Sequence, residues 1–356
     1  TEVTGEDAST IHRLLEAGID PATGKMFFAR DAENPLKCDA VIVDEMSMVD
    51  VSLLYSLLQA IPTGKRLILV GDPDQLPPVG PGFPFGDMLR SGSLPTVRLT
   101  EIFRQAQKSL IVMNAHRVNQ GEMPDLKCVS SDFFFMRRTS EEAVCALIRD
   151  LCATRLPQKM GIPTDQIQVL SPTRKGAVGT VNLNRLLQAA LNPQSPDKKE
   201  RSYGDYQFRE GDRVMQIRNN YDILWKKADG SAVGAGIFNG DVGRIQTIDP
   251  ASETLTVLFD DRLAEYDFTQ LGELEPAYAV TGHKSQGSEY RAVILSAFSG
   301  SQLLLTRSVL YTAITRAREL FIIVGNEEVI AAMTRNDRQQ RRYSGLKLRL
   351  EQGEPS

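Results

Sequence analysis

The sequence has 356 residues, of which 42% are hydrophobic and 24% are charged, and its formal net charge is −4. These values indicate a globular protein of two or three domains, exclude a disordered or fibrous chain, and argue against a passive, charge-driven binder of nucleic acid. No apolar run approaches the length of a membrane span, and four cysteines without a Cys-x-x-Cys pair, beside only three histidines, favour reduced thiols in the cytoplasm over a zinc cluster.

Short, continuous apolar runs alternate with helical stretches along most of the chain. Continuous apolar runs are typical of strands buried in parallel sheets, and their alternation with helices predicts an α/β architecture. The predicted strands cover residues 40–43, 67–70, 133–136, 167–170, 292–295 and 321–324. The predicted helices include residues 51–60, 141–154, 181–191 and 308–319.

Three other stretches depart from this alternation. Residues 18–39 contain a Pro-Ala-Thr-Gly turn, which predicts a small β-hairpin before the first core strand. Residues 201–275 lose helical periodicity and have Gly-Asp and Asn-Gly-Asp turns between alternating strands, which predicts a small antiparallel β-barrel inserted into the second α/β domain. The tail after Arg335 is rich in arginine, and we expect a solvated helix or a frayed end there.

Two acidic residues follow the first predicted core strand, in the segment 41–47, which reads Val-Ile-Val-Asp-Glu-Met-Ser. The C-terminal edge of a parallel sheet is where α/β proteins bind ligands. At that edge of a nucleotide hydrolase, Asp44 would hold Mg²⁺ and Glu45 would activate the attacking water. The alternative is that the pair only caps the helix that follows.

The second predicted strand ends in a turn that presents Gln75, in the segment 67–78, which reads Leu-Ile-Leu-Val-Gly-Asp-Pro-Asp-Gln-Leu-Pro-Pro. The amide of a glutamine both donates and accepts hydrogen bonds, which suits Gln75 to sense a γ-phosphate or to orient water. The alternative is a proline-rich turn that serves only the shape of the chain.

These two segments resemble motifs II and III of superfamily 1 helicases, and four further segments continue the resemblance in order. Residues 99–105 (Leu-Thr-Glu-Ile-Phe-Arg-Gln) resemble motif IV, and residues 169–176 (Val-Leu-Ser-Pro-Thr-Arg-Lys-Gly) resemble the start of the second motor domain. Residues 280–290 resemble motif V, and residues 311–318 resemble motif VI. The resemblance implies that Arg104 reaches the γ-phosphate and that Arg316 is an arginine finger, a group that can accelerate phosphoryl transfer by several orders of magnitude.

The branch that the chain resembles is that of the RecD-like helicases. Residues 8–15 (Ala-Ser-Thr-Ile-His-Arg-Leu-Leu) resemble the end of their motif Ia, the predicted hairpin resembles their pin domain, and the predicted barrel resembles their SH3-like domain. The resemblance implies two RecA-like parallel-sheet motor domains, the first of them incomplete. Domain 1A would cover residues 1–115 with the hairpin 18–39, domain 2A residues 116–200 and 276–356, and the SH3-like barrel residues 201–275.

The resemblance also implies the ligands and their contacts. ATP and Mg²⁺ would bind between the two motor domains, with Asp44 as the metal ligand and with nucleotide contacts from Gly287 and Glu289. The activity implied is 5′-to-3′ translocation on single-stranded DNA in recombination and repair, by the chain alone or with subunits of an exonuclease V-type complex. The implied DNA contacts are Thr10, His12, Thr173, Arg174, Asn239, Thr281 and His283. Capping, packing or solvation are the alternative roles for these residues, above all for His12.

The chain departs from the family pattern at one motif. A phosphate loop requires Gly-x-x-x-x-Gly-Lys-Ser/Thr, and neither Gly24-Lys25 nor Gly64-Lys65 satisfies it. In the family this loop precedes the segment at Thr10, so we expect a fragment that lacks the region and hydrolyses little ATP alone. Two alternatives stay open: the helicase half of a conjugative relaxase of the TraA type, and a non-catalytic DNA-binding module derived from a helicase.

Overall fold

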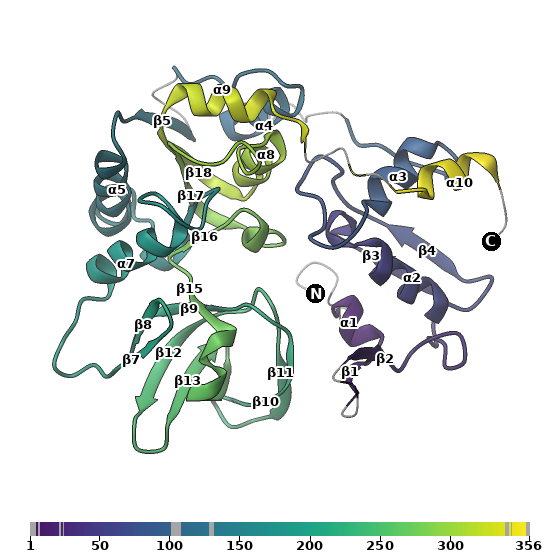
Figure 1. The fold of residues 1–356 in the computed structure, drawn as a ribbon, viewed down its shortest axis with the longest axis horizontal. Helices are drawn as coiled ribbons and strands as arrows, with labels where there is room; N and C mark the ends of the chain where they lie inside the picture. Colours follow the sequence, from purple (N-terminus) through teal and green to yellow (C-terminus); the bar gives the residue numbers. More distant parts are fainter. Residues whose placement is uncertain are drawn as a thin grey trace. The chain divides into compact units, whose positions relative to one another are not determined.

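The computed structural model describes residues 5, 8–20, 23, 25–100, 108–127, 132–338, 342 and 344–353. The chain divides into two compact units (Figure 1). Unit 1 contains the described residues of 1–101 and of 339–356, and unit 2 contains those of 102–338. The sequence-based division instead ended its first domain at residue 115 and placed residues 339–356 in the second motor domain.

Unit 1 is built on two parallel strands, β3 (Ala40–Val43) and β4 (Arg66–Leu69). The helix α2 (Val51–Ala60) begins after Asp50, whose carboxylate caps it by accepting a hydrogen bond from the backbone N–H of Leu53 at 2.8 Å. Its buried face joins the buried side chains of β3 in one apolar core. The other elements of this unit are α1 (Ile11–Leu14), β1 (Ala17–Ile19), β2 (Met26–Phe28), η1 (Met46–Met48), α3 (Pro84–Ser91) and α10 (Leu346–Gln352).

Two expectations for unit 1 need comment. The predicted hairpin is confirmed, since β1 and β2 pair antiparallel from Ala17↔Phe28 to Ile19↔Met26. The prediction that both core strands are fully buried is wrong here, because Ile42 is 68% exposed and Ile68 is 48% exposed. Successive side chains of a strand point to opposite faces, and among the described residues only one face of this pair has a covering layer.

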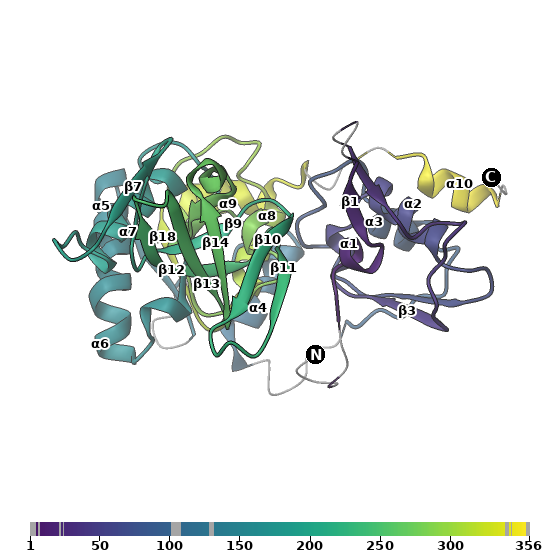
Figure 2. The same ribbon diagram turned by 90° about the horizontal axis from the view of Figure 1, so that it is seen from below.

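The C-terminal tail forms a helix without buried residues, one of the two outcomes expected, and this helix also contacts a neighbour. Its helix α10 contacts α3, as Figures 1 and 2 both show. The hydroxyl of Ser93 donates a hydrogen bond to the carbonyl of Leu350 at 3.0 Å, and the guanidinium of Arg342 donates to the carbonyl of Gly80 at 2.5 Å. The tail is therefore a packed part of unit 1.

Unit 2 contains a five-stranded parallel sheet in the order β16-β6-β17-β18-β5. The strands are β5 (Phe133–Arg137), β6 (Ile167–Leu170), β16 (Ala279–Val280), β17 (Tyr290–Ala297) and β18 (Ala317–Gly325). One face is covered by α5 (Glu141–Asp150), the π-helix η3 (Leu151–Arg155), α6 (Leu156–Met160) and α7 (Thr180–Leu191), and the other by α4 (Leu110–Asn119), α8 (Arg307–Thr315) and α9 (Glu327–Arg335) (Figure 1). All four residues of β6 are buried, as predicted for a strand covered on both faces.

Two predicted helix boundaries in unit 2 are wrong. The helix expected to end at residue 154 continues through η3 and α6 to Met160. The helix expected over 308–319 ends at Thr315, because the residues from Ala317 onward pair with β17. At the second boundary, pairing with a distant strand outweighs the local helical pattern.

The predicted β-rich insert is confirmed as a set of antiparallel strands between α7 and β16. Seven strands form one sheet in the order β11-β10-β14-β13-β12-β9-β15, and Figure 2 shows several of them side by side. They are β9 (Arg213–Gln216), β10 (Asn220–Lys227), β11 (Val233–Ile237), β12 (Val242–Asp249), β13 (Thr254–Phe259), β14 (Arg262–Asp267) and β15 (Leu274–Pro276). A hairpin of β7 (Glu200–Tyr203) and β8 (Tyr206–Arg209) precedes them, and the remaining short helices of unit 2 are η4 (Thr164–Gln166), η5 (Phe268–Glu273) and η6 (His283–Ser285).

A buried carboxylate connects this insert, called the barrel below, to helix α7. Asp212 is fully buried and accepts hydrogen bonds from the side-chain amides of Gln188 at 2.6 Å and Asn192 at 2.7 Å. It also accepts hydrogen bonds from the hydroxyl of Tyr278 at 3.0 Å and the backbone N–H of Arg209 at 2.8 Å. Burial raises the pKa of Asp212, and the four donors oppose that rise by stabilising the charged form.

Two smaller observations complete the fold. Within the described ranges, no helix combines the length and apolar character needed to cross a membrane. The described cysteines, Cys38, Cys145 and Cys152, are free thiols.

Candidate functional site

In unit 1, the two predicted acidic residues lie at the C-terminal end of β3. Asp44 is exposed, and one of its carboxylate oxygens accepts a hydrogen bond from the backbone N–H of Glu45 at 2.8 Å. The backbone of Glu45 has φ 52° and ψ 41°, the left-handed region that non-glycine residues seldom adopt. This conformation turns the chain abruptly from β3 into η1. Strained backbone of this kind concentrates at functional sites, where the surrounding fold maintains it.

The turn after β4 packs directly against the turn after β3. The backbone N–H of Met46 donates to the carbonyl of Val70 at 2.9 Å. A Cβ atom at Gly71 would lie 2.9 Å from the backbone nitrogen of Met46, so this approach requires glycine. Gln75 follows in the same loop and is only 7% exposed, and its side-chain oxygen has no hydrogen-bond partner among the described residues. A buried acceptor without a partner is costly, and in a native protein it often marks a ligand contact.

The chemistry of this strand edge fits Mg²⁺. Mg²⁺ is held in nucleotide hydrolases by one or two carboxylates, with the remaining positions taken by water and phosphate oxygens. The exposed carboxylate of Asp44 offers the hard oxygen ligand that this arrangement needs. No cluster of three or more metal-ligating side chains is present in the described part of the chain.

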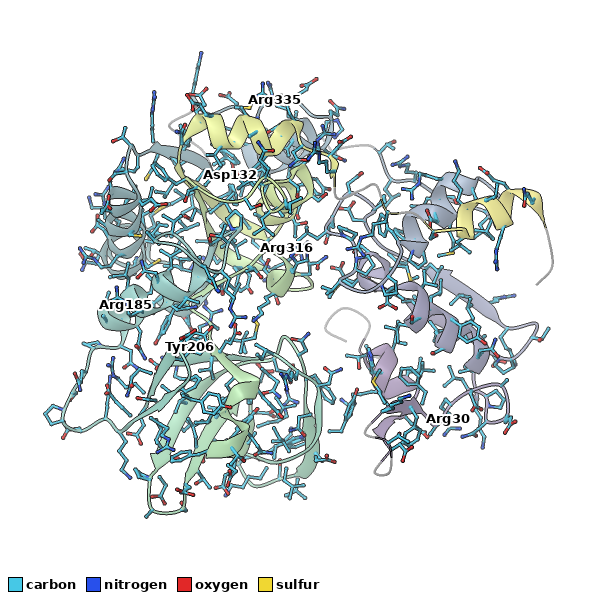
Figure 3. All side chains as sticks on the ribbon, viewed as in Figure 1. Arg30, Asp132, Arg185, Tyr206, Arg316 and Arg335 are labelled. Atoms are coloured by element: carbon cyan, nitrogen blue, oxygen red, sulfur yellow. The ribbon has the colours of Figure 1, made fainter. Side chains whose placement is uncertain are left out.

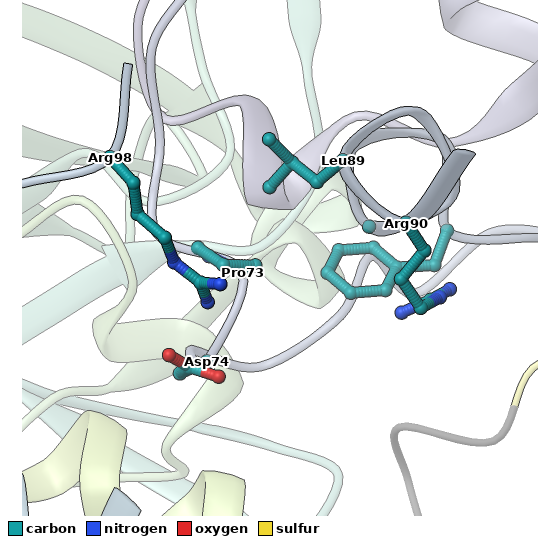
Figure 4. A pocket seen from close by; sticks show the side chains of 7 residues that line it. Pro73, Asp74, Leu89, Arg90 and Arg98 are labelled. Atoms are coloured by element: carbon teal, nitrogen blue, oxygen red, sulfur yellow. The ribbon is translucent and has the colours of Figure 1, made fainter. Parts of the chain in front are cut away.

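A pocket of about 230 Å³ lies beside the same loop (Figure 4). It is lined by Pro73, Asp74, Phe83, Gly86, Leu89, Arg90 and Arg98. In Figure 4 the side chain of Arg98 points toward Pro73 and Asp74, whereas Leu89 and Arg90 come from α3. Arg90 is also paired with Asp87 at 2.7 Å, so this pocket combines both signs of charge.

In unit 2, the predicted arginine finger is a buried residue at the end of α8 (Figure 3). Arg316 is 4% exposed, and its guanidinium donates hydrogen bonds to the carbonyl of Ser288 at 3.2 Å and the hydroxyl of Thr315 at 3.4 Å. Its Nε has no partner among the described residues, and none of the described acidic side chains forms an ion pair with it. A buried cation without a counter-charge is unfavourable, so this arginine is suited to receive an anion.

The segment that contacts Arg316 comes from the predicted motif V, since Arg316 donates to the carbonyl of Ser288. Gly287 has φ 74° in the turn that carries Ser288, a conformation that favours glycine. Glu289 is exposed and paired with Arg318 at 2.8 Å. Arg316 and Arg318 thus have different surroundings although only one residue separates them.

Two of the predicted DNA contacts, Arg174 and Thr281, line one pocket of about 180 Å³ in unit 2. The pocket lies where β6 and β16 end, at the C-terminal edge of the parallel sheet, and Thr180, the first residue of α7, also lines it. His283 lies in η6, two residues after Thr281, and Thr173 directly precedes Arg174. The structure therefore gathers four predicted contacts around the start of α7 and the motif V turn.

The other predicted contacts lie elsewhere. Thr10 caps α1 by accepting a hydrogen bond from the backbone N–H of Arg13 at 3.3 Å. His12 lies in α1 with its ring 5.8 Å from that of Phe28, and burial lowers its pKa. Asn239 is exposed in a barrel turn, where its backbone N–H donates to the side chain of Asn219 at 3.0 Å. Arg104 lies outside the described residues.

Sequence reasoning missed three polar residues around Arg174, two of which, Glu275 and Lys284, line its pocket. Glu275 pairs with both Arg174 and Lys284, and the guanidinium of Arg174 also donates to the hydroxyl of Tyr206 at 3.1 Å. Lys284 could have been noted, since it adjoins His283 in the same motif. Nothing local singles out Glu275 or Tyr206, because each lies on a barrel strand far from Arg174 in the sequence.

Comparison with known families gives three matches along the chain. An ATP-dependent RecD-like DNA helicase SH3 domain matches residues 183–259, which span most of α7 and the barrel up to β13. An AAA domain matches residues 1–81, and a UvrD-like helicase C-terminal domain matches residues 276–324. In chain order, the three matches thus lie on unit 1, on the barrel, and on the strands β16, β17 and β18 of the parallel sheet.

Individual relatives agree with these matches. The ATP-dependent RecD2 DNA helicase of Deinococcus radiodurans is 35% identical over 95% of this chain and 43% of its own length. The RecBCD enzyme subunit RecD of Mycolicibacterium smegmatis is 30% identical over 98% of this chain and 60% of its own length. The chain spans about half the length of the curated relatives it matches.

A solved structure supports the fold. The structure of Bacteroides Pif1 bound to single-stranded DNA has a TM-score of 0.51 with 17% identity, over 90% of this chain and 80% of that one. With the SH3 domain match, the helicase C-terminal match and the two RecD-type relatives, the chain belongs to the RecD-like branch of the superfamily 1 helicases.

Proposed function

We propose that this chain forms the motor of an ATP-dependent helicase that translocates 5′ to 3′ on single-stranded DNA during recombination and repair. The observation that supports the proposal most directly is Arg316, a buried guanidinium with an unpartnered Nε and no acidic partner among the described side chains. Such a group is suited to an anionic transition state rather than to a structural ion pair. The free thiols of the described cysteines suit a cytoplasmic setting.

In this proposal each unit contributes defined chemistry to ATP hydrolysis. Asp44 holds Mg²⁺, which would neutralise charge on the phosphates when bound. Glu45 accepts a proton from the attacking water, Gln75 contacts the γ-phosphate or the water, and Arg104 belongs to the same set. Gly287 and Glu289 lie near the nucleotide, and Arg316 stabilises the charge that develops during transfer.

The DNA contacts proposed for the motor come from both units. In unit 2, Thr173, Arg174, Thr281 and His283 lie around the sheet edge described above, and Asn239 adds a contact from the barrel. Thr10 and His12 of unit 1 complete the set. We further propose that the helicase works by itself or with exonuclease V-type subunits, since the RecD relative is a subunit of the RecBCD enzyme.

The test measures ATP hydrolysis and the direction of translocation on DNA separately. In a form of the protein that also carries a phosphate loop, oligothymidylate should stimulate ATP hydrolysis strongly, and streptavidin should be displaced from a 3′-biotinylated strand and not from a 5′-biotinylated one. Absence of ATP hydrolysis with DNA binding retained would favour a DNA-binding module without catalysis, and hydrolysis that DNA does not stimulate would contradict a motor coupled to DNA. Displacement from the 5′ end would contradict the polarity alone.

A further inference from the structure

One carboxylate, that of Glu275, lines the Arg174 pocket. The two oxygens of Glu275 are divided between two cations, with Oε1 2.8 Å from Nη2 of Arg174 and Oε2 2.5 Å from Nζ of Lys284. The side chain of Glu275 is 13% exposed, whereas those of Lys284 and Arg174 are 28% and 56% exposed. The acid is therefore inside the pocket, and the two cations reach it from the rim.

The three residues come from three different segments of unit 2. Arg174 lies in the loop between β6 and α7, Lys284 lies in η6, and Glu275 lies on β15, the last strand of the barrel. The barrel thus supplies an anion to a pocket that it shares with the motor sheet. The Coulombic effect of Glu275 is also the main cause that raises the pKa of Arg174.

The pocket has the features of a phosphate site even without its acid. It lies at the C-terminal edge of two parallel strands, the usual ligand position in α/β proteins, and the N-terminal residue of α7 lines it. Thr180 and Thr281 add hydroxyl groups to the lining. The guanidinium of Arg174 contacts Glu275 and Tyr206, and both contacts use Nη2.

A carboxylate that bridges two cations with one oxygen each imitates two non-bridging oxygens of a phosphodiester. We propose that Glu275 is an internal competitor for a phosphate-binding pocket on the path of single-stranded DNA, holding Arg174 and Lys284 until a backbone phosphate replaces it. This inference rests on the proposed function, because it takes single-stranded DNA as the ligand. The pocket would then be a phosphate subsite for single-stranded DNA, and Glu275 would lower its affinity for the phosphate.

Removing a carboxylate that competes with phosphate has a consequence that removing one partner of a purely structural ion pair does not have. While Glu275 is present, a phosphate gains only the net single positive charge of the three side chains. Removing the acid leaves two positive charges for the same phosphate, so affinity and its salt dependence should both increase. For single strands, each additional neutralised phosphate changes the slope of log K against log salt by about −0.7.

The experiment measures binding of the chain to a fluorescent oligothymidylate of about 12 nucleotides by anisotropy over a range of salt concentrations. Glu275→Gln should bind about fivefold more tightly at low salt, with a steeper slope. Lys284→Met should bind more weakly with a shallower slope. In the double variant the gain from Glu275→Gln should shrink, because one of the released cations is gone.

Matched controls separate this effect from a general change in charge. Glu265→Gln removes an acid from the exposed surface of β14, and Lys226→Met removes a cation from the exposed surface of β10. Equal effects of Glu275→Gln and Glu265→Gln, or weaker binding by a Glu275→Gln variant that melts like the parent, would overturn the inference and leave the motor proposal standing. If the parent chain bound no oligothymidylate at all, the proposed DNA function would fail as well.

Discussion

The hydroxyl of Tyr278 donates a hydrogen bond to the carboxylate of Asp212 at 3.0 Å, and this bond joins the segment before β9 to the segment after β15. Tyr278 lies between β15 and β16, where the chain returns to the motor sheet, and Asp212 lies immediately before β9. Burial raises the pKa of the Tyr278 hydroxyl, which keeps it a neutral donor to the carboxylate. The orientation of the barrel on the sheet therefore depends on a buried carboxylate with four donors.

Asp212→Asn should destabilise this joint by about 3 kcal/mol, because an amide places N–H groups against donors that need an acceptor. The barrel contains Trp225, the only tryptophan of the chain, so its fluorescence during urea unfolding reports on this region. The transition of the Asp212→Asn variant should move to lower urea concentration.

The matched control for this change is Asp222→Asn, which alters an exposed residue of β10 in the same barrel. It should leave the midpoint of the tryptophan transition in place. Equal midpoints for the two variants would show that the hydrogen bonds to Asp212 add nothing to the stability of the barrel.

Gly71→Ala should loosen the contact between the turns that follow β3 and β4. The added Cβ would lie 2.9 Å from the backbone nitrogen of Met46, and forcing the turns apart should cost about 1 to 3 kcal/mol. Hydrogen exchange of the backbone amides in residues 40–48 should accelerate. Gly345→Ala in the same unit meets no atom within 4 Å and should leave that exchange unchanged.

Glu45→Gln should abolish ATP turnover and preserve ATP binding in a form of the protein that hydrolyses ATP. Glutamine fits the left-handed backbone as well as glutamate does, and Asp44 stays available for Mg²⁺, so only the base is removed. We expect a fall in rate of about 100-fold or more. Glu253→Gln changes another glutamate with a positive φ of 55°, in a barrel turn, and should keep the parent rate. Near-normal hydrolysis by Glu45→Gln would show that this carboxylate serves only the turn.

The sequence predicted strands better than it predicted what covers them. The run at Ile167 to Leu170 includes a glutamine and the run at Ala40 to Val43 is wholly apolar, yet the first is fully buried and the second leaves Ile42 exposed. The number of layers on a sheet is set by distant segments, which a local apolar pattern does not encode. For the same reason, packing of α10 on α3 was not foreseen from the charged tail.

The residues of the candidate site were also predictable only in part. Motif positions placed Asp44, Glu45 and Gln75 on neighbouring turns, because parallel strands bring their C-terminal ends to one edge. The pairing of Glu275 with Arg174 joins residues about a hundred positions apart and depends on how the barrel returns to the sheet. The spacing of residues within a local motif gives no information about a pair so far apart in the sequence.

Arg316 and Arg318 allow the proposed arginine finger to be tested against its neighbour. The helix expected over residues 308–319 would contain both arginines, and residues two positions apart do not share a helix face. In the structure Arg316 ends α8 with its guanidinium buried, whereas Arg318 lies on β18 in an exposed pair with Glu289. Lysine has a single ammonium group and cannot reproduce the planar fork that donates to Ser288 and Thr315 and leaves Nε for an anion.

Arg316→Lys should therefore lower the rate of ATP hydrolysis by roughly 1,000-fold or more, with little change in DNA affinity. Arg318→Lys should be nearly silent, because an exposed pair contributes little and lysine can still pair with Glu289. The test measures the rate of ATP hydrolysis and the affinity for oligothymidylate of both variants, in a form of the protein that hydrolyses ATP. If both variants lost activity equally, or if Arg316→Lys mainly weakened DNA binding, Arg316 would have a structural or DNA-binding role and the finger would have to be sought elsewhere.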